Sequence, residues 1–128
     1  MKRYLIILWF LSSVVNSQTK YYVATTGNDS NAGTIAEPFA TWEKGASVLT
    51  AGDTLYIRGG TYTNTRASIY QCLWNTLSGT VNDTIKIWAY PGEIPVWDLI
   101  GMPDLSSSGV YQSFAMEMNE CDYVWVRG

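Results

Sequence analysis

The sequence predicts an all-β chain that coils as a parallel β-helix, in which successive turns of the chain stack short strands into several sheets. Three similar segments carry this prediction: 53–58 (DTLYIR), 83–88 (DTIKIW) and 122–127 (DYVWVR). Each starts with Asp and continues as a strand with aliphatic third and fifth positions, so its apolar side chains share one face. Because one such strand cannot bury its apolar face alone, its recurrence indicates stacked coils.

The segments between these three also fit a solenoid. Short strands are expected at 60–62, 96–98 and 110–118, separated by turn residues such as the Gly pair at 59–60. The three similar segments start 30 and then 39 residues apart, a spacing that loop insertions between coils explain. An antiparallel sandwich is the alternative, but no Asn-Gly or Asp-Gly hairpin turn joins alternating runs in this sequence.

Residues 1–17 are predicted to be a signal peptide and not part of the fold. Two basic residues precede an apolar run over 4–15, and Ser17 offers a small residue for cleavage. This run of 12 residues is well short of the roughly 20 that span a bilayer. We therefore expect residues 18–128 to be exported, to the extracellular space, a periplasm or the cell surface, with no membrane span after signal removal.

The mature chain is expected to open with a strand over 20–24, a turn-rich loop over 26–33 and a helix over 38–50. Four apolar residues recur at helical spacing: Phe39, Trp42, Ala46 and Leu49. Gly45 inside this helix costs about 1 kcal/mol relative to Ala, so the helix has to be held by packing. We expect it to cover the open N-terminal end of the β-helix, because a solenoid needs its ends covered.

The composition excludes several classes of protein. The chain has no His, which excludes Ser-His-Asp catalysis and His-ligated zinc. It has 8 basic and 11 acidic residues, net −3, and removal of Lys2 and Arg3 leaves 6 against 11, net −5. This balance argues against nucleic acid as a partner. We expect a monomer.

Two sets of oxygen-bearing side chains could hold a metal ion or could be ordinary turn residues. The loop over 28–31 (NDSN) has oxygens spaced as in a calcium-binding turn but lacks the number of carboxylates. The Asp residues that open the three similar segments, Asp53, Asp83 and Asp122, could stack as a column. In both cases we favour turn residues that accept hydrogen bonds from backbone N–H groups. We assign no metal ligand and no catalytic residue within this sequence.

The chain contains two cysteines, Cys72 and Cys121. Export would permit a disulfide between them. The alternative is two small buried side chains with no bond.

Several short motifs resemble a known group of proteins. They are GNDS (27–30), GT (33–34), PFAT (38–41), AGDT (51–54) and GGTY (59–62), followed by residues 87–98 and 122–128. Together they resemble the N-terminal region of secreted right-handed parallel β-helix proteins of the pectate-lyase-like superfamily. Within it the chain looks most like the polysaccharide lyases of family nine. The resemblance implies a right-handed β-helix, of which this chain holds the N-terminal capping helix and the first coils.

The resemblance also implies a function. Related lyases cleave anionic uronate polymers by β-elimination: calcium bound by Asp carboxylates acidifies a proton, and a Lys or Arg removes it. Those residues sit on middle coils, so we expect the catalytic and calcium-binding residues beyond residue 128. Two alternatives use the same scaffold: a non-catalytic surface adhesin or glycan-binding protein, and a β-helix glycoside hydrolase with paired carboxylates.

Outward side chains of the three similar segments form a candidate binding site for an acidic polysaccharide. If Leu55, Ile85 and Val124 stack inside, two outward columns follow: Tyr56, Lys86 and Trp125, and Arg58, Trp88 and Arg127. Aromatic rings would pack on sugar faces, and Arg side chains would bind carboxylates with two hydrogen bonds. The candidate substrate-binding residues are Arg58, Lys86, Trp88, Trp125 and Arg127. The alternative is that these columns only stabilise the sheet surface.

Overall fold

The computed structural model describes residues 17–63, 70–98 and 114–128. All but the last residue of the predicted signal peptide, and the first part of the strand expected over 110–118, lie outside these ranges. The described elements are β1 (Lys20–Val23), α1 (Trp42–Ser47), β2 (Thr54–Ile57), β3 (Gly60–Thr63), β4 (Tyr70–Asn75), β5 (Ile85–Ala89), β6 (Pro95–Asp98), β7 (Phe114–Asn119) and β8 (Val124–Arg127).

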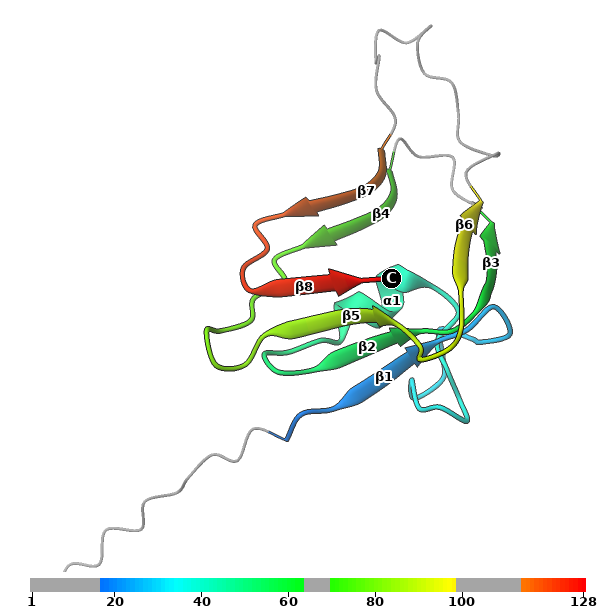
Figure 1. The fold of residues 1–128 in the computed structure, drawn as a ribbon, viewed down its shortest axis with the longest axis horizontal. Helices are drawn as coiled ribbons and strands as arrows, with labels where there is room; N and C mark the ends of the chain where they lie inside the picture. The colour runs from blue at the N-terminus through cyan, green and yellow to red at the C-terminus, as the bar shows by residue number, and fades with distance from the viewer. Residues whose placement is uncertain (1–16, 64–69, 99–113) are drawn as a thin grey trace, which may run out of the picture.

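The strands form three parallel sheets, one with the order β1-β2-β5-β8, one of β3 and β6 and one of β4 and β7. The strands β2, β3 and β4 enter the three sheets in turn, and β5, β6 and β7 add to the same sheets in the same order (Figure 1). The chain therefore winds in coils, and the predicted parallel β-helix is confirmed.

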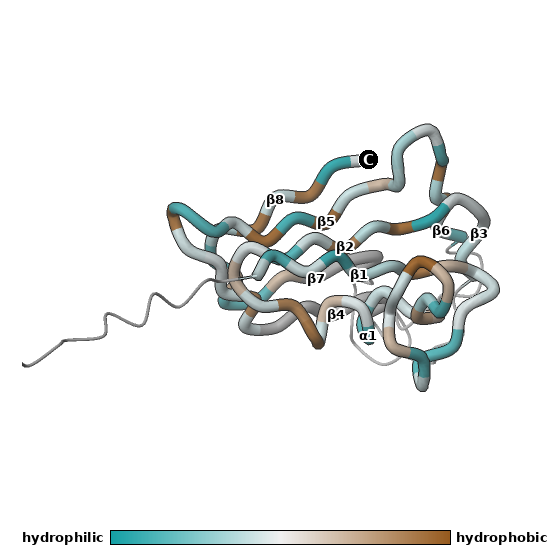
Figure 2. The backbone as a smooth tube through the Cα atoms, turned by 90° about the horizontal axis from the view of Figure 1, so that it is seen from below, coloured by the Kyte–Doolittle hydropathy of each residue, from teal (hydrophilic) through white to brown (hydrophobic). Residues whose placement is uncertain are grey.

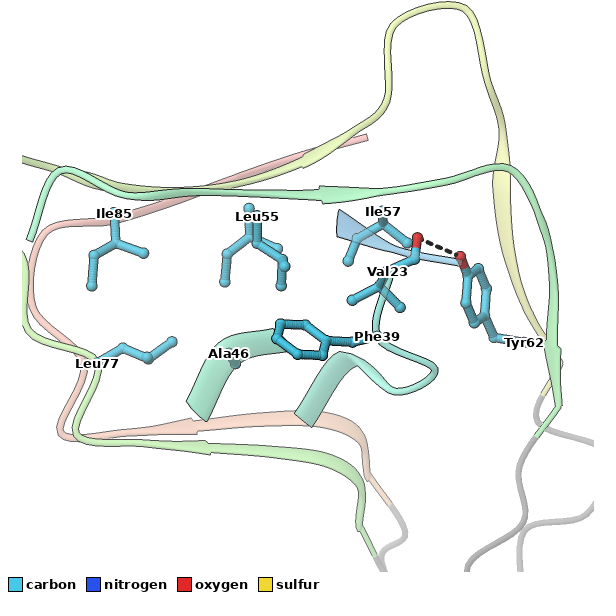
Figure 3. Packing of buried hydrophobic residues seen from close by; sticks show 9 residues of the cluster. Val23, Phe39, Ala46, Leu55, Ile57, Tyr62, Leu77 and Ile85 are labelled. Atoms are coloured by element: carbon cyan, nitrogen blue, oxygen red, sulfur yellow. Dashed lines mark hydrogen bonds between the residues drawn. The ribbon is translucent and has the colours of Figure 1, made fainter. Parts of the chain in front are cut away.

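The core lies inside the coils and is built by the alternation of side chains along the strands. Leu55 and Ile57 of β2 and Ile85 and Ile87 of β5 are all buried. Leu55, Ile57 and Ile85 point inward from the four-stranded sheet towards Ala46 and the other core residues (Figure 3). Along β5 and β8 the hydropathy alternates from residue to residue (Figure 2). The predicted inward face of β2 and β5 is confirmed.

The register between β2 and β5 differs from the prediction. Leu55 lies opposite Ile87, two residues further along than the expected Ile85, whereas Ile85 lies opposite Val124 as predicted. Side chains in a strand alternate with a period of two, so a shift of two residues keeps every apolar side chain inside and leaves no trace in the sequence pattern.

The loop before β5 accounts for this shift. Thr80 and Asp83 exchange backbone hydrogen bonds of 3.1 and 3.2 Å, which close a tight turn outside the sheet. Asp83 therefore belongs to a loop, whereas Asp53 lies directly before β2 and its carbonyl accepts a bond from Lys86 N. Asp53 and Asp83 were predicted to occupy equivalent positions in successive coils, and this prediction is wrong.

The helix is shorter than the predicted 38–50. It begins after Thr41, whose side chain accepts a hydrogen bond from Lys44 N at 3.1 Å. Phe39 is extended instead, because its N–H donates to Tyr22 O and its carbonyl accepts from Ala24 N, both at 2.9 Å. The apolar residues predicted to share a face still do so, since Phe39, Trp42, Ala46 and Leu49 all pack in or against the core.

The helix α1 packs against β1, β2 and β4, at the β1 end of the four-stranded sheet. The expected cover over the N-terminal end is therefore present. Gly45 allows the close approach: a Cβ there would lie 2.8 Å from Leu55 Cδ1 and 2.8 Å from Val23 Cγ2. The glycine that weakens the helix locally is thus required by its packing.

The loop over 28–31 is a hydrogen-bonded turn. Asn28 Oδ1 accepts from Ser30 N at 2.8 Å, and Asp29 Oδ1 accepts from the backbone N–H groups of Ala40 and Thr41, both at 2.9 Å. Asp29 Oδ2 accepts from the Thr41 hydroxyl at 2.9 Å. The carboxylate therefore pins the residues that lead into α1, which supports the interpretation as a turn.

Asp53 is buried, and its carboxylate links the residue before β1 to the loop before β2. Its Oδ1 accepts from Thr19 N, and its Oδ2 accepts from the backbone N–H and the hydroxyl of Thr50, all at 2.8 Å. Asp122 instead forms a parallel bridge with Ser78. The three Asp residues do not stack, so the hypothesis of a carboxylate column is wrong.

The Cys121 thiol donates to Asn119 O at 3.3 Å and packs against the core. The side chain of Cys72 lies outside the described residues, so the disulfide stays a prediction.

Candidate functional site

The outward face of the four-stranded sheet gathers aromatic and basic side chains. Neighbouring strands place residues directly opposite one another, so the outward positions form columns that cross the strands. One column is Lys20, Thr54, Lys86 and Trp125, and the next is Tyr22, Tyr56, Trp88 and Arg127. These two columns cover all four strands of the sheet.

Four of these residues form a cation–aromatic patch, which we define as Lys86 and Trp88 of β5 and Trp125 and Arg127 of β8. Lys86 lies opposite Trp125, and Trp88 lies opposite Arg127. Each cationic side chain therefore has one indole on its own strand and another on the neighbouring strand. The two indole rings meet edge to face, with centroids 5.3 Å apart. Lys86 Nζ lies 5.9 Å from the Trp88 ring centroid, within range of a cation–π contact.

The patch is accessible to a ligand. Trp125 is 52% exposed and Arg127 is exposed, whereas Lys86 and Trp88 are half-buried. The Trp88 indole N–H is buried and has no hydrogen-bond partner among the described residues. Neither Lys86 nor Arg127 forms an ion pair with any residue that the structure describes.

The fifth predicted residue, Arg58, does not join the patch. Because of the register shift it lies beside Tyr90, with its guanidinium carbon 4.7 Å from the Tyr90 ring centroid, and not beside Trp88. Arg58 and Tyr90 thus form a cation–π contact between successive coils. Tyr56 is likewise opposite Trp88, and not opposite Lys86 as predicted.

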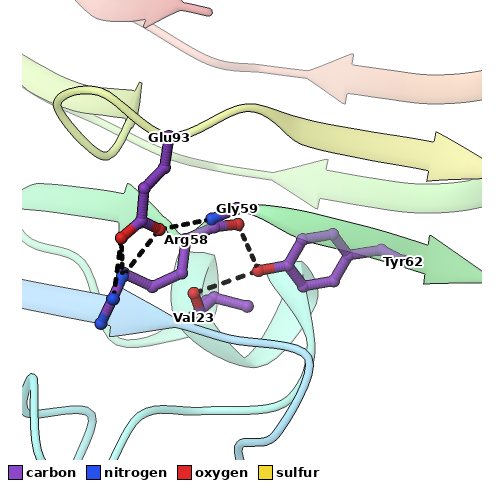
Figure 4. A network of polar contacts seen from close by, with 5 residues as sticks. All are labelled: Val23, Arg58, Gly59, Tyr62 and Glu93. Atoms are coloured by element: carbon purple, nitrogen blue, oxygen red, sulfur yellow. Dashed lines mark hydrogen bonds and ion pairs between the residues drawn. The ribbon is translucent and has the colours of Figure 1, made fainter.

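Arg58 is held by Glu93, in the turn after β5 (Figure 4). Arg58 Nη2 lies 2.8 Å from Glu93 Oε1, and Arg58 Nε lies 2.9 Å from Oε2. The Gly59 N–H donates to the same carboxylate at 2.6 Å. The bond to Arg58, followed by the bond from Gly59, lowers the pKa of Glu93, and the bond to Glu93 raises the pKa of Arg58.

Tyr62 extends this polar network into the core. Its hydroxyl lies 2.8 Å from Arg58 O and 3.2 Å from Val23 O, both of which accept. Burial raises the pKa of Tyr62 to about 12. The hydroxyl is thus a fixed donor that joins three parts of the chain, and Arg58 belongs to a structural network.

Three tyrosines lie next to the patch and form a tyrosine cluster, which we define as Tyr22, Tyr56 and Tyr90. The rings of Tyr22 and Tyr56 stack at 5.6 Å, and Tyr90 contacts both, at 6.1 and 5.7 Å. Stacked rings cover one another's faces, so these two offer mainly their edges and hydroxyl groups to the outside.

The sequence reasoning missed Lys20 and Glu93 as parts of this face. Lys20 opens β1 and is exposed, in the same column as Lys86. The segment around it has no leading Asp and was not aligned with the three similar segments. The sequence indicates Glu93 only weakly, through its position directly after the Pro-Gly turn at 91–92.

The patch suits a ligand that carries both a ring face and negative charge. Indole rings offer flat apolar surface, and Lys and Arg side chains bind carboxylates, Arg with two parallel hydrogen bonds. Within residues 17–63, 70–98 and 114–128, no three His, Cys, Asp or Glu side chains gather as metal ligands. The described part of the chain also contains no helix of the length and hydropathy needed to cross a membrane.

Comparison with known proteins agrees with this fold. Residues 21–128 match the family described as the Pel9A-like, right-handed β-helix region. Over 91 residues, 68% of this chain, the sequence is 40% identical to "Pectate lyase PEL9" of Emericella nidulans. A solved structure titled "Rhamnogalacturonan lyase" superposes with a TM-score of 0.65 over 88% of this chain, at 28% identity.

The match covers 21% of the pectate lyase and 28% of the rhamnogalacturonan lyase, so the chain spans less than a third of the length of these relatives. The predicted resemblance to right-handed β-helix lyases is confirmed by the family match over most of the chain. The chain belongs to the Pel9A-like family of right-handed β-helix proteins.

Proposed function

We propose that this chain is the N-terminal cap and first coils of an exported polysaccharide lyase that cleaves anionic uronate polymers. The family match over residues 21–128 is the observation that carries the proposal. The relative named pectate lyase supports the substrate class. The short span of the match supports a longer protein, with further coils after residue 128.

The proposed reaction is β-elimination. A base removes the proton from the carbon beside the uronate carboxylate, and the electron pair forms a double bond to the next ring carbon. The bond from that carbon to the bridging oxygen breaks, and the oxygen takes up a proton and leaves as a hydroxyl of the released sugar chain. The described residues offer no cluster of carboxylates for calcium, so we assign no calcium ligand and no catalytic residue to them. Both sets of residues are proposed to lie beyond residue 128.

This segment is proposed to contribute substrate binding through the cation–aromatic patch. Lys86 and Arg127 would bind uronate carboxylates, and Trp88 and Trp125 would pack against sugar rings. Arg58, which the sequence placed in this group, is instead engaged with Glu93. We therefore leave Arg58 out of the proposed substrate contacts.

The test is to assay the full-length protein on polygalacturonate with and without a chelator. Elimination leaves an unsaturated product that absorbs in the ultraviolet, and we expect this absorbance to rise and to stop when calcium is removed. Reducing ends without unsaturated product would favour a β-helix hydrolase. Binding without any product would favour a non-catalytic adhesin or glycan-binding protein.

Export is part of the same proposal. The basic start and apolar run within residues 1–17 support it. Expression in the native host and mass spectrometry of the protein in the medium should find an N-terminus at Gln18. Retention of residues 1–17 on a cell-associated protein would contradict export by a cleaved signal.

A further inference from the structure

We infer that the outward face of the four-stranded sheet binds an acidic polysaccharide that lies across the strands, along the column from Lys20 to Trp125. The ligand class rests on the proposed function, whereas the direction of the polymer and the role of Lys20 come from the structure. The polymer would contact β1, β5 and β8, which belong to different coils.

The positions of the basic residues give the first argument. Lys20 and Lys86 occupy the same column, separated by Thr54 of β2. Adjacent strands lie about 4.8 Å apart, so the two lysines start about 10 Å from one another across the sheet. Arg127 lies one strand beyond Lys86, in the next column. A polymer with a carboxylate on each sugar meets a cation repeatedly along this direction.

The positions of the acidic residues give the second argument. A polymer that ran along β5 would leave the patch at one end towards the loop of Asp83. Asp122 lies just before β8, on the same side as Asp83. A polyanion is therefore repelled at this end of the strand direction and attracted across the strands.

The charge of the face gives the third argument. None of Lys20, Lys86 and Arg127 forms an ion pair with a described residue, although the chain has a net charge of −3. Arg58, by contrast, is paired with Glu93. Three basic residues that keep their charge unpaired on one face of an acidic chain are complementary to a polyanion.

The ring arrangement agrees with this direction. Trp125 follows the lysines in the same column and is half exposed, edge to face with Trp88. Tyr22 and Tyr56 follow the neighbouring column, with their edges outward. A sugar chain along the first column would meet the Trp125 indole, with the stacked tyrosines beside the column and outside the proposed contacts.

The experiment measures affinity of the full-length protein for polygalacturonate by affinity electrophoresis, at low and high salt. We compare Lys20→Gln, Lys86→Gln and the double variant with Lys44→Gln, a matched control on α1. Each sheet variant should weaken binding roughly two- to fivefold, as expected for exposed ion pairs, and should reduce the salt dependence. Lys44→Gln should change neither, and circular dichroism should show an intact fold in all four.

Oligomer length tests the direction of the polymer. Lys20→Gln should weaken binding of long chains and leave short oligogalacturonates unaffected, whereas Lys86→Gln should weaken both. An effect of Lys86→Gln with none of Lys20→Gln on long chains would overturn binding across the strands. An equal effect of Lys44→Gln, or equal affinity for a neutral polysaccharide, would overturn the binding face altogether.

The binding readout is independent of catalysis, so the two proposals can fail separately. A protein that forms no unsaturated product but loses affinity in the sheet variants would contradict the lyase and support the binding face. If the protein is an active lyase and the double variant keeps the affinity and KM of the wild type, only the proposed binding face is contradicted.

Discussion

The Arg58 guanidinium and the Glu93 carboxylate form a two-pronged ion pair between successive coils of the β-helix, at 2.8 and 2.9 Å. The same carboxylate accepts the Gly59 N–H, just before β3 begins. The pair therefore fixes the corner where the chain leaves the four-stranded sheet, and holds it against the equivalent corner of the next coil (Figure 4).

Replacement of Glu93 by Gln should lower the stability of the protein. The amide removes the charge that pairs with Arg58 but keeps the size of the side chain, so the loss reports the ion pair. The denaturant midpoint of Glu93→Gln should fall below that of the wild type. Glu37→Gln is the control, because Glu37 is exposed and its side chain forms no ion pair in the described part of the chain. An equal midpoint in the two variants would contradict this prediction.

The contribution of Glu93 should depend on pH. Arg58 lowers the pKa of Glu93 in the folded protein, whereas an unfolded Glu titrates at about 4.3. A lowered folded pKa adds stability that is fully present above the unfolded pKa and is lost as the pH falls through the folded pKa. The difference in midpoint between wild type and Glu93→Gln should therefore be constant from pH 7 to about 5 and shrink at more acidic pH. A difference that stays constant down to pH 2 would contradict this account.

Replacement of Gly45 by Ala should destabilise the fold although Ala is the better helix former. The added Cβ would lie 2.8 Å from Leu55 Cδ1 and from Val23 Cγ2 in a packed core. Overpacking costs about 1–3 kcal/mol and the gain in helix propensity is about 1 kcal/mol, so we expect a net loss of up to about 2 kcal/mol. Ser47→Ala, on the exposed side of the same helix, is the control and should change stability little. Stabilisation by Gly45→Ala, measured by denaturant titration, would show that α1 is not held against β1 and β2.

Replacement of Trp42 tests whether its ring fastens the helix to the coils. The ring lies 4.5 Å from that of Trp97 and 5.5 Å from that of Tyr62, between centroids. Trp42→Ala should cost about 3 kcal/mol, as large-to-small changes of packed aromatic residues do. Trp42→Phe should cost less than half of this, because it keeps a ring and also removes a buried indole N–H that has no described partner. Equal losses in the two variants would contradict the role of ring packing.

The sequence was sufficient to predict the coil and its inward face. The three similar segments appear as β2, β5 and β8, and the aliphatic positions of β2 and β5 are buried. The reason is physical: alternation of apolar and polar residues along a strand determines which side faces the core. The resemblance added the handedness and the family.

The register of β2 against β5 could not be predicted from the sequence. For the same reason, the sequence could not show which residues make up the cation–aromatic patch. A shift of two residues satisfies the same alternation, so only the turn at Thr80–Asp83 and the backbone bonds around it decide between the alternatives. The shift moves Arg58 from Trp88 to Tyr90 and brings Glu93 to it. Lys86, Trp88, Trp125 and Arg127 were placed correctly relative to one another because β5 and β8 pair in the predicted register, with Ile85 opposite Val124.

The helix boundary was mispredicted for a similar reason. Helical spacing of apolar residues marks the side that faces the core but not where the helix begins. Phe39 faces the core from extended backbone, since its N–H and carbonyl bond to β1, and Thr41 then caps the helix. The residue at which the helix begins is therefore determined by hydrogen bonds to residues that are distant in the sequence.

Trp125 and Tyr56 should separate binding from stability on the same face of the sheet. Trp125 is 52% exposed and meets Trp88 edge to face, whereas the Tyr56 ring is half-buried, stacked on Tyr22 and in contact with Tyr90. Trp125→Ala should therefore weaken binding of polygalacturonate, by roughly five- to tenfold for loss of about 1–1.5 kcal/mol of ring contact, and leave the denaturant midpoint close to that of the wild type. Tyr56→Ala should lower the midpoint, because it removes a ring that two others pack against, and leave the affinity within about twofold. Trp125→Phe is the matched control and should retain most of the affinity. If Trp125→Ala lowered stability without changing affinity, the patch would serve only to stabilise the sheet surface, as a ladder between coils.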